Sequence, residues 1–339
     1  THTIIMNKYY SLTRHDWEQS LANLINQFVI YAPLLYGEQQ DYELIEADSI
    51  PQIVYNQPKP ATPLKTFFMP VEENVVHIEP SSRRRIILGI PSCDLEAANI
   101  QDEMYLNRDY VDPVYKKNRD ASILIGTDCH NIQEHCHCTT YGIKPYPQSN
   151  HDLTLSLFGG IIYLYTHSEK GDGLIKEMEK FTTFQEPTEN EIQALLDKRG
   201  EVEGLLNQNN QGLPDYRKTG ELVDQSNEEI WKKYSQTCVS CGACATICPT
   251  CTCFLLMERP GFEKVRHLDA CQYPGFEKVA AGEDPLRPLH KRFYNRYMCK
   301  YVWKPQKFES IACTGCGRCI EACIGDINKN ELFMELVNH

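Results

Sequence analysis

The sequence predicts an α/β domain over residues 1–215, followed by a mainly helical domain over residues 216–339. Three observations predict this division. Two short apolar runs with a helical segment between them mark the first part as α/β. The 16 cysteines are unevenly spread, with four before residue 140 and twelve between Cys238 and Cys323. A turn-rich segment at 207–214, which contains Gly212 and Pro214, separates the two parts.

The first part contains a β-α-β pattern. Residues 85–90 and 121–126 are continuous apolar runs typical of buried parallel strands, and residues 94–106 between them have helical apolar spacing. Parallel neighbours end at the same edge of a sheet, so Cys93 and Cys129, each three residues beyond a strand, are predicted to lie close together. We also expect helices over 17–28, 173–181, 189–206 and 287–301, and a strand over 29–31.

Composition narrows the class of protein. An apolar fraction of 42% with 24% charged residues excludes disorder for most of the chain, and the net charge of −12 disfavours a nucleic-acid partner. No segment reaches the roughly 18 apolar residues of a membrane span. Residues 1–8 lack the apolar core and cleavage site of a secretory signal, so we expect a cytoplasmic protein whose cysteines bind metal rather than form disulfides.

The strongest motif is a four-cysteine run that occurs twice. The first run is Cys-x2-Cys-x2-Cys-x3-Cys-Pro, and the second has the same spacing with Ile324 in place of the proline. This spacing is typical of ferredoxins with two 4Fe-4S clusters, in which the fourth cysteine of each run binds the other cluster. It predicts one cluster on Cys238, Cys241, Cys244 and Cys323, and a second on Cys313, Cys316, Cys319 and Cys248. Structural zinc sites also use Cys-x2-Cys and are the alternative.

A third set comes from the first part of the chain. The four cysteines Cys93, Cys129, Cys136 and Cys138 fall on loops predicted to be adjacent, and a third 4Fe-4S cluster is the preferred interpretation. Because His130, His135 and His137 are interleaved with them, a mixed Cys/His zinc site is an alternative, and unligated buried thiols are another.

The remaining cysteines follow no complete motif. Cys251, Cys253 and Cys271 are candidates for further metal ligation or for packing as small apolar side chains, and Cys299 is expected to be structural. Between residues 285 and 308 the chain carries seven Lys or Arg and no Asp or Glu. These cations are expected to support an anionic cluster or to form a docking surface. The sequence contains neither a Gly-rich nucleotide loop nor a recognisable catalytic arrangement.

Over most of its length the chain resembles a family of iron-sulfur electron-transfer subunits. These subunits occur in anaerobic sulfite reductase and, as the beta subunit, in sulfhydrogenase, a cytoplasmic nickel-iron hydrogenase. The resemblance is carried by Cys-Pro-Thr-Cys-Thr-Cys-Phe at 248–254, Asp-Ala-Cys-Gln-Tyr-Pro-Gly-Phe at 269–276, Arg-Phe-Tyr at 292–294 and the second run at 313–319. Pro-Ser-Cys-Asp-Leu at 91–95, Tyr-Val-Asp-Pro at 110–113 and Cys-His-Cys at 136–138 extend it into the first part.

This resemblance implies a subunit of a hetero-oligomer with no substrate site of its own. It implies electron transfer between a flavoprotein that oxidises NAD(P)H and a partner with the terminal reductase or hydrogenase centre. Two other functions stay open from the residues alone. One is a subunit with its own flavin or sulfur-reducing site in the first domain, and the other is a zinc-stabilised interaction module.

Overall fold

The computed structural model describes residues 8–76, 84–107 and 109–338, so the segment used to predict the compartment lies outside these residues except for Lys8. The strands are β1 (Tyr9–Thr13), β2 (Val29–Tyr36), β3 (Gln39–Leu44), β4 (Glu72–Asn74), β5 (Arg85–Pro91), β6 (Ser122–Thr127), β7 (Leu153–Phe158), β8 (Ile161–Thr166), β9 (Phe254–Arg259) and β10 (Glu263–Leu268). The α-helices are α1 (Arg14–Leu24), α2 (Ser92–Tyr105), α3 (Pro113–Asp120), α4 (Glu169–Met178), α5 (Glu189–Asn209), α6 (Tyr216–Asp224), α7 (Glu228–Ser235), α8 (Ala243–Thr246), α9 (Leu289–Tyr297), α10 (Lys304–Phe308), α11 (Arg318–Glu321) and α12 (Lys329–Val337). Three 3-10 turns, η1 (Ile50–Gln52), η2 (Leu64–Phe67) and η3 (Cys138–Tyr141), and one π-helix, η4 (Met298–Trp303), complete the elements.

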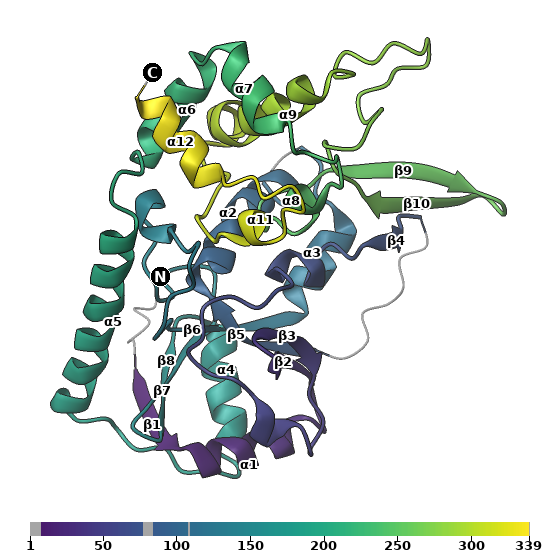
Figure 1. Ribbon diagram of the computed structural model, residues 1–339. Coiled ribbons are helices and arrows are strands. Elements are labelled where there is room, and N and C mark those ends of the chain that lie inside the picture. The colour runs from purple at the N-terminus through teal and green to yellow at the C-terminus, as the bar shows by residue number, and fades with distance from the viewer. Residues whose placement is uncertain (1–7, 77–83, 108, 339) are drawn as a thin grey trace.

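The N-terminal part is built on one sheet with the strand order β1-β8-β7-β6-β5-β2-β3. The four central strands β2, β5, β6 and β7 are parallel, and the outer strands β1, β8 and β3 are antiparallel to their neighbours. Helices α1 and α4 cover one face, where Trp17 and Leu174 are buried against the strands (Figure 1). Helices α2 and α3 cover the other face through Leu95 and Tyr115. The α/β prediction for this part is confirmed, including the parallel pairing of β5 with β6.

Strand β5 contains a bulge between Leu88 and Ile90, and its apolar side chains pack on both faces of the sheet. Ile86 and Leu88 pack on the α1 side and Ile87 on the α2 side, as ordinary strand alternation requires. Ile90 packs on the α2 side as well, because the register shifts between Leu88 and Ile90. Gly89 lies in this shift with φ 76°, a left-handed conformation that glycine adopts without strain. The bulge at Gly89 therefore allows Leu88 and Ile90 to pack on opposite faces of the sheet.

Strand β2 is longer than the expected 29–31, because it continues through Pro33 to Tyr36. Proline cannot donate to a ladder, but β2 pairs with β5 only over Val29–Tyr31. Beyond that point β2 pairs with β3 alone, and Pro33 stands opposite Tyr42 there. No ladder bond to β5 is therefore needed from Pro33, and its carbonyl accepts a hydrogen bond from the backbone N–H of Val54 over 2.9 Å.

The C-terminal part combines helices with a hairpin and irregular loops. Helices α6, α7, α9 and α12 and the π-helix η4 share an apolar core that includes Trp231, Tyr297 and Phe333. The expected helix at 287–301 is found as α9 and η4, which continue into α10. The long helix α5, which runs along one side of the molecule, leads into this part (Figure 1). It ends at Asn209, so the first three residues of the predicted turn-rich segment are helical.

A second, three-stranded sheet joins distant parts of the chain. Its order is β4-β10-β9, so β4 from the first part pairs with the β9–β10 hairpin, which projects from the body of the protein (Figure 1). Arg266 on β10 forms ion pairs with Glu73 on β4 and with Asp112 at the start of α3. Across the described residues, no helix combines the length and apolar character needed to cross a membrane.

Candidate metal centres

The two cysteine runs share a cavity in the C-terminal part. Its lining includes Cys238, Cys241 and Cys244 from the first run together with Cys323 from the second. Cys319 also reaches this cavity, which brings the two runs into contact. The backbone N–H of Ile327 donates a hydrogen bond to the Cys323 sulfur over 3.3 Å, the kind of contact that tunes a cluster. Cysteines of both runs therefore line the same cavity, and the assignment of four of them to one cluster stays a prediction.

Both runs have the same local backbone. In each run the residues on either side of the second cysteine are left-handed, at Ser240 (φ 56°) and Gly242 (φ 74°) in the first and Gly315 (φ 64°) and Gly317 (φ 79°) in the second. Short helices α8 and α11 begin directly after these glycines. A Cβ on Gly242 would lie 2.5 Å from the Tyr273 ring, so only glycine fits there. This repeated turn aims consecutive thiols inward.

A buried lysine joins two segments that contribute to the second predicted set. Lys300 Nζ lies 3.1 Å from the Cys248 sulfur and donates to the carbonyl oxygen of Ala312, the residue before Cys313, over 2.6 Å. The Thr250 hydroxyl donates to the same carbonyl and lies 3.3 Å from the Cys248 sulfur. These contacts hold the end of the first run against the beginning of the second. Cys316 is within electrostatic reach of both Cys248 and Cys319.

The N-terminal thiols line a separate cavity. Cys93 lies in the first turn of α2 directly after β5, and Cys129 follows β6, so the parallel pairing of these strands brings the two loops together. Cys136 and Cys138 complete the four thiols of this cavity, and Cys316 of the second run lines it as well. Burial raises the pKa of the Cys93 and Cys129 thiols well above its usual range, and that of Cys138 to about 12. Such thiols would bind as thiolates only when a metal centre replaces their protons.

Two of the three histidines near these thiols, His130 and His137, have other partners. His130 Nε2 lies 3.3 Å from the Asn56 amide nitrogen and 3.2 Å from the Ser156 hydroxyl. His137 contacts the His135 carbonyl through Nδ1 (2.7 Å) and Lys329 through Nε2 (2.8 Å). Among the described residues, the lining of this cavity includes cysteines but no histidine. This geometry favours an all-thiolate set over the Cys/His alternative.

Four of the seven cations between 285 and 308 turn toward the cysteines. These four are Arg292, Arg296, Lys300 and Lys304, which recur every fourth residue. Their side chains are buried or half-buried, whereas Arg287, Lys291 and Lys307 are exposed. Arg296 donates to the Cys244 carbonyl over 3.1 Å, and Arg292 donates to the Ser240 hydroxyl over 3.2 Å. Four-residue spacing places side chains on one helix face, a signal that could have separated the two groups from the sequence.

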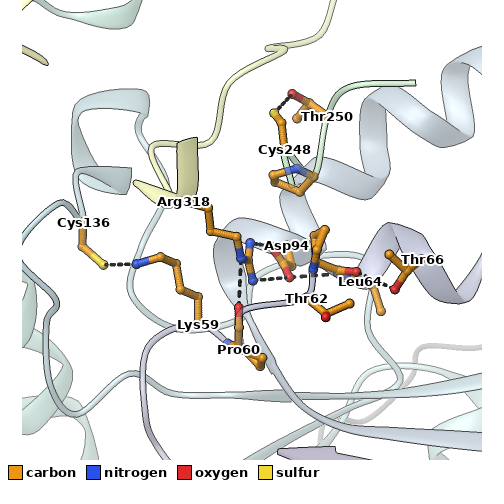
Figure 2. A network of polar contacts seen from close by, with 12 residues as sticks. Lys59, Pro60, Thr62, Leu64, Thr66, Asp94, Cys136, Cys248, Thr250 and Arg318 are labelled. Atoms are coloured by element: carbon orange, nitrogen blue, oxygen red, sulfur yellow. Dashed lines mark hydrogen bonds and ion pairs between the residues drawn. The ribbon is translucent and has the colours of Figure 1, made fainter. Parts of the chain in front are cut away.

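Two further cations lie near the thiols and could not be identified from the sequence: Lys59 from the first part of the chain and Arg318 from the second. Figure 2 shows Arg318, next to Cys319, facing Asp94, next to Cys93. The guanidinium donates to the carboxylate over 2.9 Å, and both side chains are almost fully buried. In the same figure Lys59 points to the Cys136 sulfur at 3.9 Å, and its ammonium also pairs with Glu321 at 2.7 Å. These pairs bind the N-terminal thiol loops to the second run.

The chemistry of the lining fits 4Fe-4S clusters. Three buried hydroxyls without a hydrogen-bond partner among the described residues each lie next to a cysteine in sequence: Ser92, Thr139 and Thr314. Such donors are expected to pair with something, and the sulfurs of a cluster accept hydrogen bonds. In the described ranges, no group of three or more His, Cys, Asp or Glu side chains is arranged to hold a single metal ion. The thiols instead surround hollows, as the ligands of a multi-atom cluster do.

Comparison with known proteins decides the type of centre. Residues 237–327 match the family of 4Fe-4S dicluster domains. The C-terminal part contains a 4Fe-4S dicluster domain. The whole chain is also similar to the sulfhydrogenase 2 subunit beta of Pyrococcus furiosus, with 27% identity over 323 residues that cover 91% of this chain and 92% of that protein. The resemblance and the 4Fe-4S cofactor predicted from the sequence are therefore confirmed.

Proposed function

We propose that this chain is the electron-relay subunit of a multi-subunit hydrogenase of the sulfhydrogenase type. In this proposal one cluster is bound by Cys238, Cys241, Cys244 and Cys323, a second by Cys313, Cys316, Cys319 and Cys248, and a third by Cys93, Cys129, Cys136 and Cys138. We also propose that the chain divides near residue 215 into an α/β domain with the third site and a dicluster domain. Each bound cluster supplies a one-electron redox centre.

The observation that supports this proposal is that the three thiol sets adjoin one another in series. Cys316 of the second set reaches the cavity of the N-terminal set, and Cys319 of the second set reaches the cavity of the first set. The His135–Cys138 loop packs on Gly315 and Gly317, where any Cβ would overlap its backbone. Cys93, Cys248, Cys313 and Cys316 are buried, and a protein environment that excludes water helps to set the redox potential of a cluster.

The proposal also indicates where electrons reach the surface of the protein and which partners dock on it. Cys241 is exposed, whereas Cys93 and Cys316 are buried, so electrons reach the molecular surface most directly at the first set. We propose that a flavoprotein that oxidises NAD(P)H and a terminal hydrogenase or sulfur-reducing subunit dock on this chain. The named relative is a subunit of a sulfhydrogenase, which supports a hydrogenase as the terminal partner.

A Cys241→Ala variant tests this function in the complex purified without oxygen. It is expected to lose one cluster, about four iron atoms per chain. NAD(P)H-linked hydrogen production should fall to a small fraction of the wild-type rate, while hydrogen oxidation with methyl viologen, which accepts electrons directly from the terminal centre, should be retained.

The control is Val337→Ala, an exposed position on α12 away from the thiols, which should keep both the iron and the linked activity. Unchanged iron in Cys241→Ala would refute the ligand assignment. Bound flavin in the isolated chain, or turnover of polysulfide or sulfite by it, would replace the relay with a catalytic subunit. Zinc in place of iron would identify the chain as a zinc-stabilised interaction module instead.

A further inference from the structure

Four cysteines remain outside the three sets, and the fold brings them to one region. The three sets use twelve of the 16 cysteines, which leaves Cys251, Cys253, Cys271 and Cys299. Cys251 and Cys253 precede β9, and Cys271 follows β10, so the pairing of these strands returns Cys271 to the start of the hairpin. The backbone N–H of Asp269 donates to the Cys253 carbonyl over 3.0 Å, which fixes the approach of the two segments.

Two of the first three thiols contact each other, and the third lies near them. A hydrogen bond joins the Cys253 and Cys271 side chains, and Cys251 is within electrostatic reach of Cys271. Cys251 is buried with Cys248, Ala245 and Ala270 in a small cluster at the base of the hairpin. Three thiols are therefore gathered beside the end of the first cysteine run.

The fourth thiol comes from the π-helix. Cys299 lies in η4, which interrupts the helical path between α9 and α10. An extra residue per turn changes the direction in which the following side chains point, and such segments often occur at functional sites. Lys300 on η4 donates to the Thr250 hydroxyl over 2.7 Å and Lys304 on α10 donates to the Thr250 carbonyl over 2.8 Å, so this part of the helical path lies against the segment that carries Cys251 and Cys253. The Cys299 thiol is within electrostatic reach of Cys253. The sequence gives no sign of this placement, because Cys299 has no neighbouring cysteine at ligand spacing.

Cations and amide donors surround these four thiols. Lys304 is within electrostatic reach of Cys251, Cys253 and Cys299, and its ammonium is held by the Thr250 carbonyl at 2.8 Å. The buried Lys65 donates to the Cys251 carbonyl over 3.0 Å, and the Gln272 amide lies 3.7 Å from the Cys271 sulfur. A 4Fe-4S cluster with four thiolates is an anion, and buried anions need such compensation.

We propose that Cys251, Cys253, Cys271 and Cys299 bind a fourth 4Fe-4S cluster, with the π-helix supplying the fourth ligand. This inference extends the proposed relay and rests on it. Lys300 connects the fourth site to the second, since its ammonium lies 3.1 Å from the Cys248 sulfur and 3.9 Å from the Cys251 sulfur. The site stands at the base of the projecting β9–β10 hairpin, whose Phe254, Leu255 and Leu256 side chains are exposed. It provides a second branch from the second set toward the surface.

The test compares iron and acid-labile sulfide in the full chain purified without oxygen, together with EPR spectra. The wild type is expected to contain about sixteen iron atoms per chain, four for each cluster. Cys299→Ala is expected to contain about twelve, or about fifteen with the EPR signal of an oxidised 3Fe-4S cluster, if the cluster survives with three ligands. Met298→Leu, at the adjacent buried position of the π-helix, should keep the wild-type iron and spectra.

The outcomes separate this inference from the proposed function. A wild type with about twelve iron atoms, and Cys299→Ala with the same content, would overturn the fourth cluster and leave the three-cluster relay intact. A Cys253–Cys271 disulfide or one bound zinc per chain would overturn it as well. Loss of iron in Cys241→Ala but not in Cys299→Ala would likewise overturn the fourth cluster and leave the first cluster in place. If Cys299→Ala does not fold, the iron content of the wild type and of a Cys271→Ala variant tests the proposal instead. About sixteen iron atoms in the wild type and a loss of iron in Cys271→Ala would support it, and about twelve in both would overturn it.

Discussion

The buried ion pair of Asp94 and Arg318 shows how single residues join the two parts of the chain. Asp94 accepts from Arg318 and also from the backbone N–H of Leu64 at 3.1 Å, and Arg318 donates to the Pro60 carbonyl at 2.9 Å. Each partner follows or precedes a cysteine of a different predicted site. The pair therefore fixes the position of the N-terminal set relative to the second set.

Asp94→Ala is expected to lower the free energy of unfolding by about 3–5 kcal/mol, because it leaves the Arg318 guanidinium buried without its carboxylate. The measurement is the denaturant midpoint of the holoprotein under anaerobic conditions. Asp120→Ala removes the exposed i,i+4 pair with Lys116 and should cost less than about 1 kcal/mol. Equal losses in the two variants would contradict the role of Asp94.

His151, before β7, and His167, after β8, are expected to make the stability of the protein depend on pH. Their rings lie 3.9 Å apart, and both contact the Thr154 hydroxyl. Burial, followed by the positive charges of His151 and Arg199, lowers the pKa of His167 to about 3, and burial lowers that of His151. Between the folded pKa of about 3 and the ordinary value of about 6.5, only the unfolded chain takes up the proton.

The stability of the protein should therefore decrease as the pH falls from 7 toward 4. His167→Gln should reduce this loss, which thermal unfolding midpoints at pH 5 and pH 7.5 would measure against the wild type. Clusters also respond to acid, so the comparison uses the difference between the variant and the wild type at each pH. The same decrease in both proteins would contradict this account.

At the scale of elements, two helical glycines have opposite surroundings. A Cβ on Gly204, on the exposed side of α5, would meet no atom within 4 Å. A Cβ on Gly220, in α6, would lie 2.6 Å from the Tyr301 carbonyl oxygen of the π-helix η4. Gly220 thus permits the close approach of α6 to the element that carries Cys299.

Gly204→Ala is expected to stabilise the protein by about 0.5–1 kcal/mol, because alanine restricts the unfolded chain and favours the helix. Gly220→Ala should destabilise it, and it should also disturb the spectra of the fourth cluster, since η4 must shift. Denaturant midpoints and EPR spectra of the two variants check this. A stabilising Gly220→Ala would show that the α6–η4 contact is not tight.

The elements also show what the sequence could predict. Strands β5 and β6 and helix α5 follow from local spacing, because their periods are short. The crossed assignment of the cysteines to two clusters is a prediction from the same kind of local spacing. The pairing of β4 with β10 and the π-helix do not follow from local spacing, because one joins residues nearly two hundred positions apart and the other depends on tertiary contacts. For the same reason Lys59, Lys65 and Arg318 could not be assigned to the thiol sites from the sequence.

At the scale of the whole molecule, the two parts form a branched series of thiol sets. The second set lies at the centre, in contact with the N-terminal set through Cys316, with the first set through Cys319 and with the fourth set through Lys300. An acidic protein with a net charge of −12 places buried cations at these junctions, where cluster anions would otherwise repel one another. This is the arrangement expected of a relay with more than one outlet.

The content of iron, zinc and acid-labile sulfide per chain, measured on protein purified without oxygen, tests this account most directly. The account predicts about sixteen iron and sixteen sulfide with no stoichiometric zinc, all reducible as 4Fe-4S clusters in low-temperature EPR. About eight iron with one or two zinc would confine electron transfer to the dicluster domain and contradict the relay through the N-terminal set.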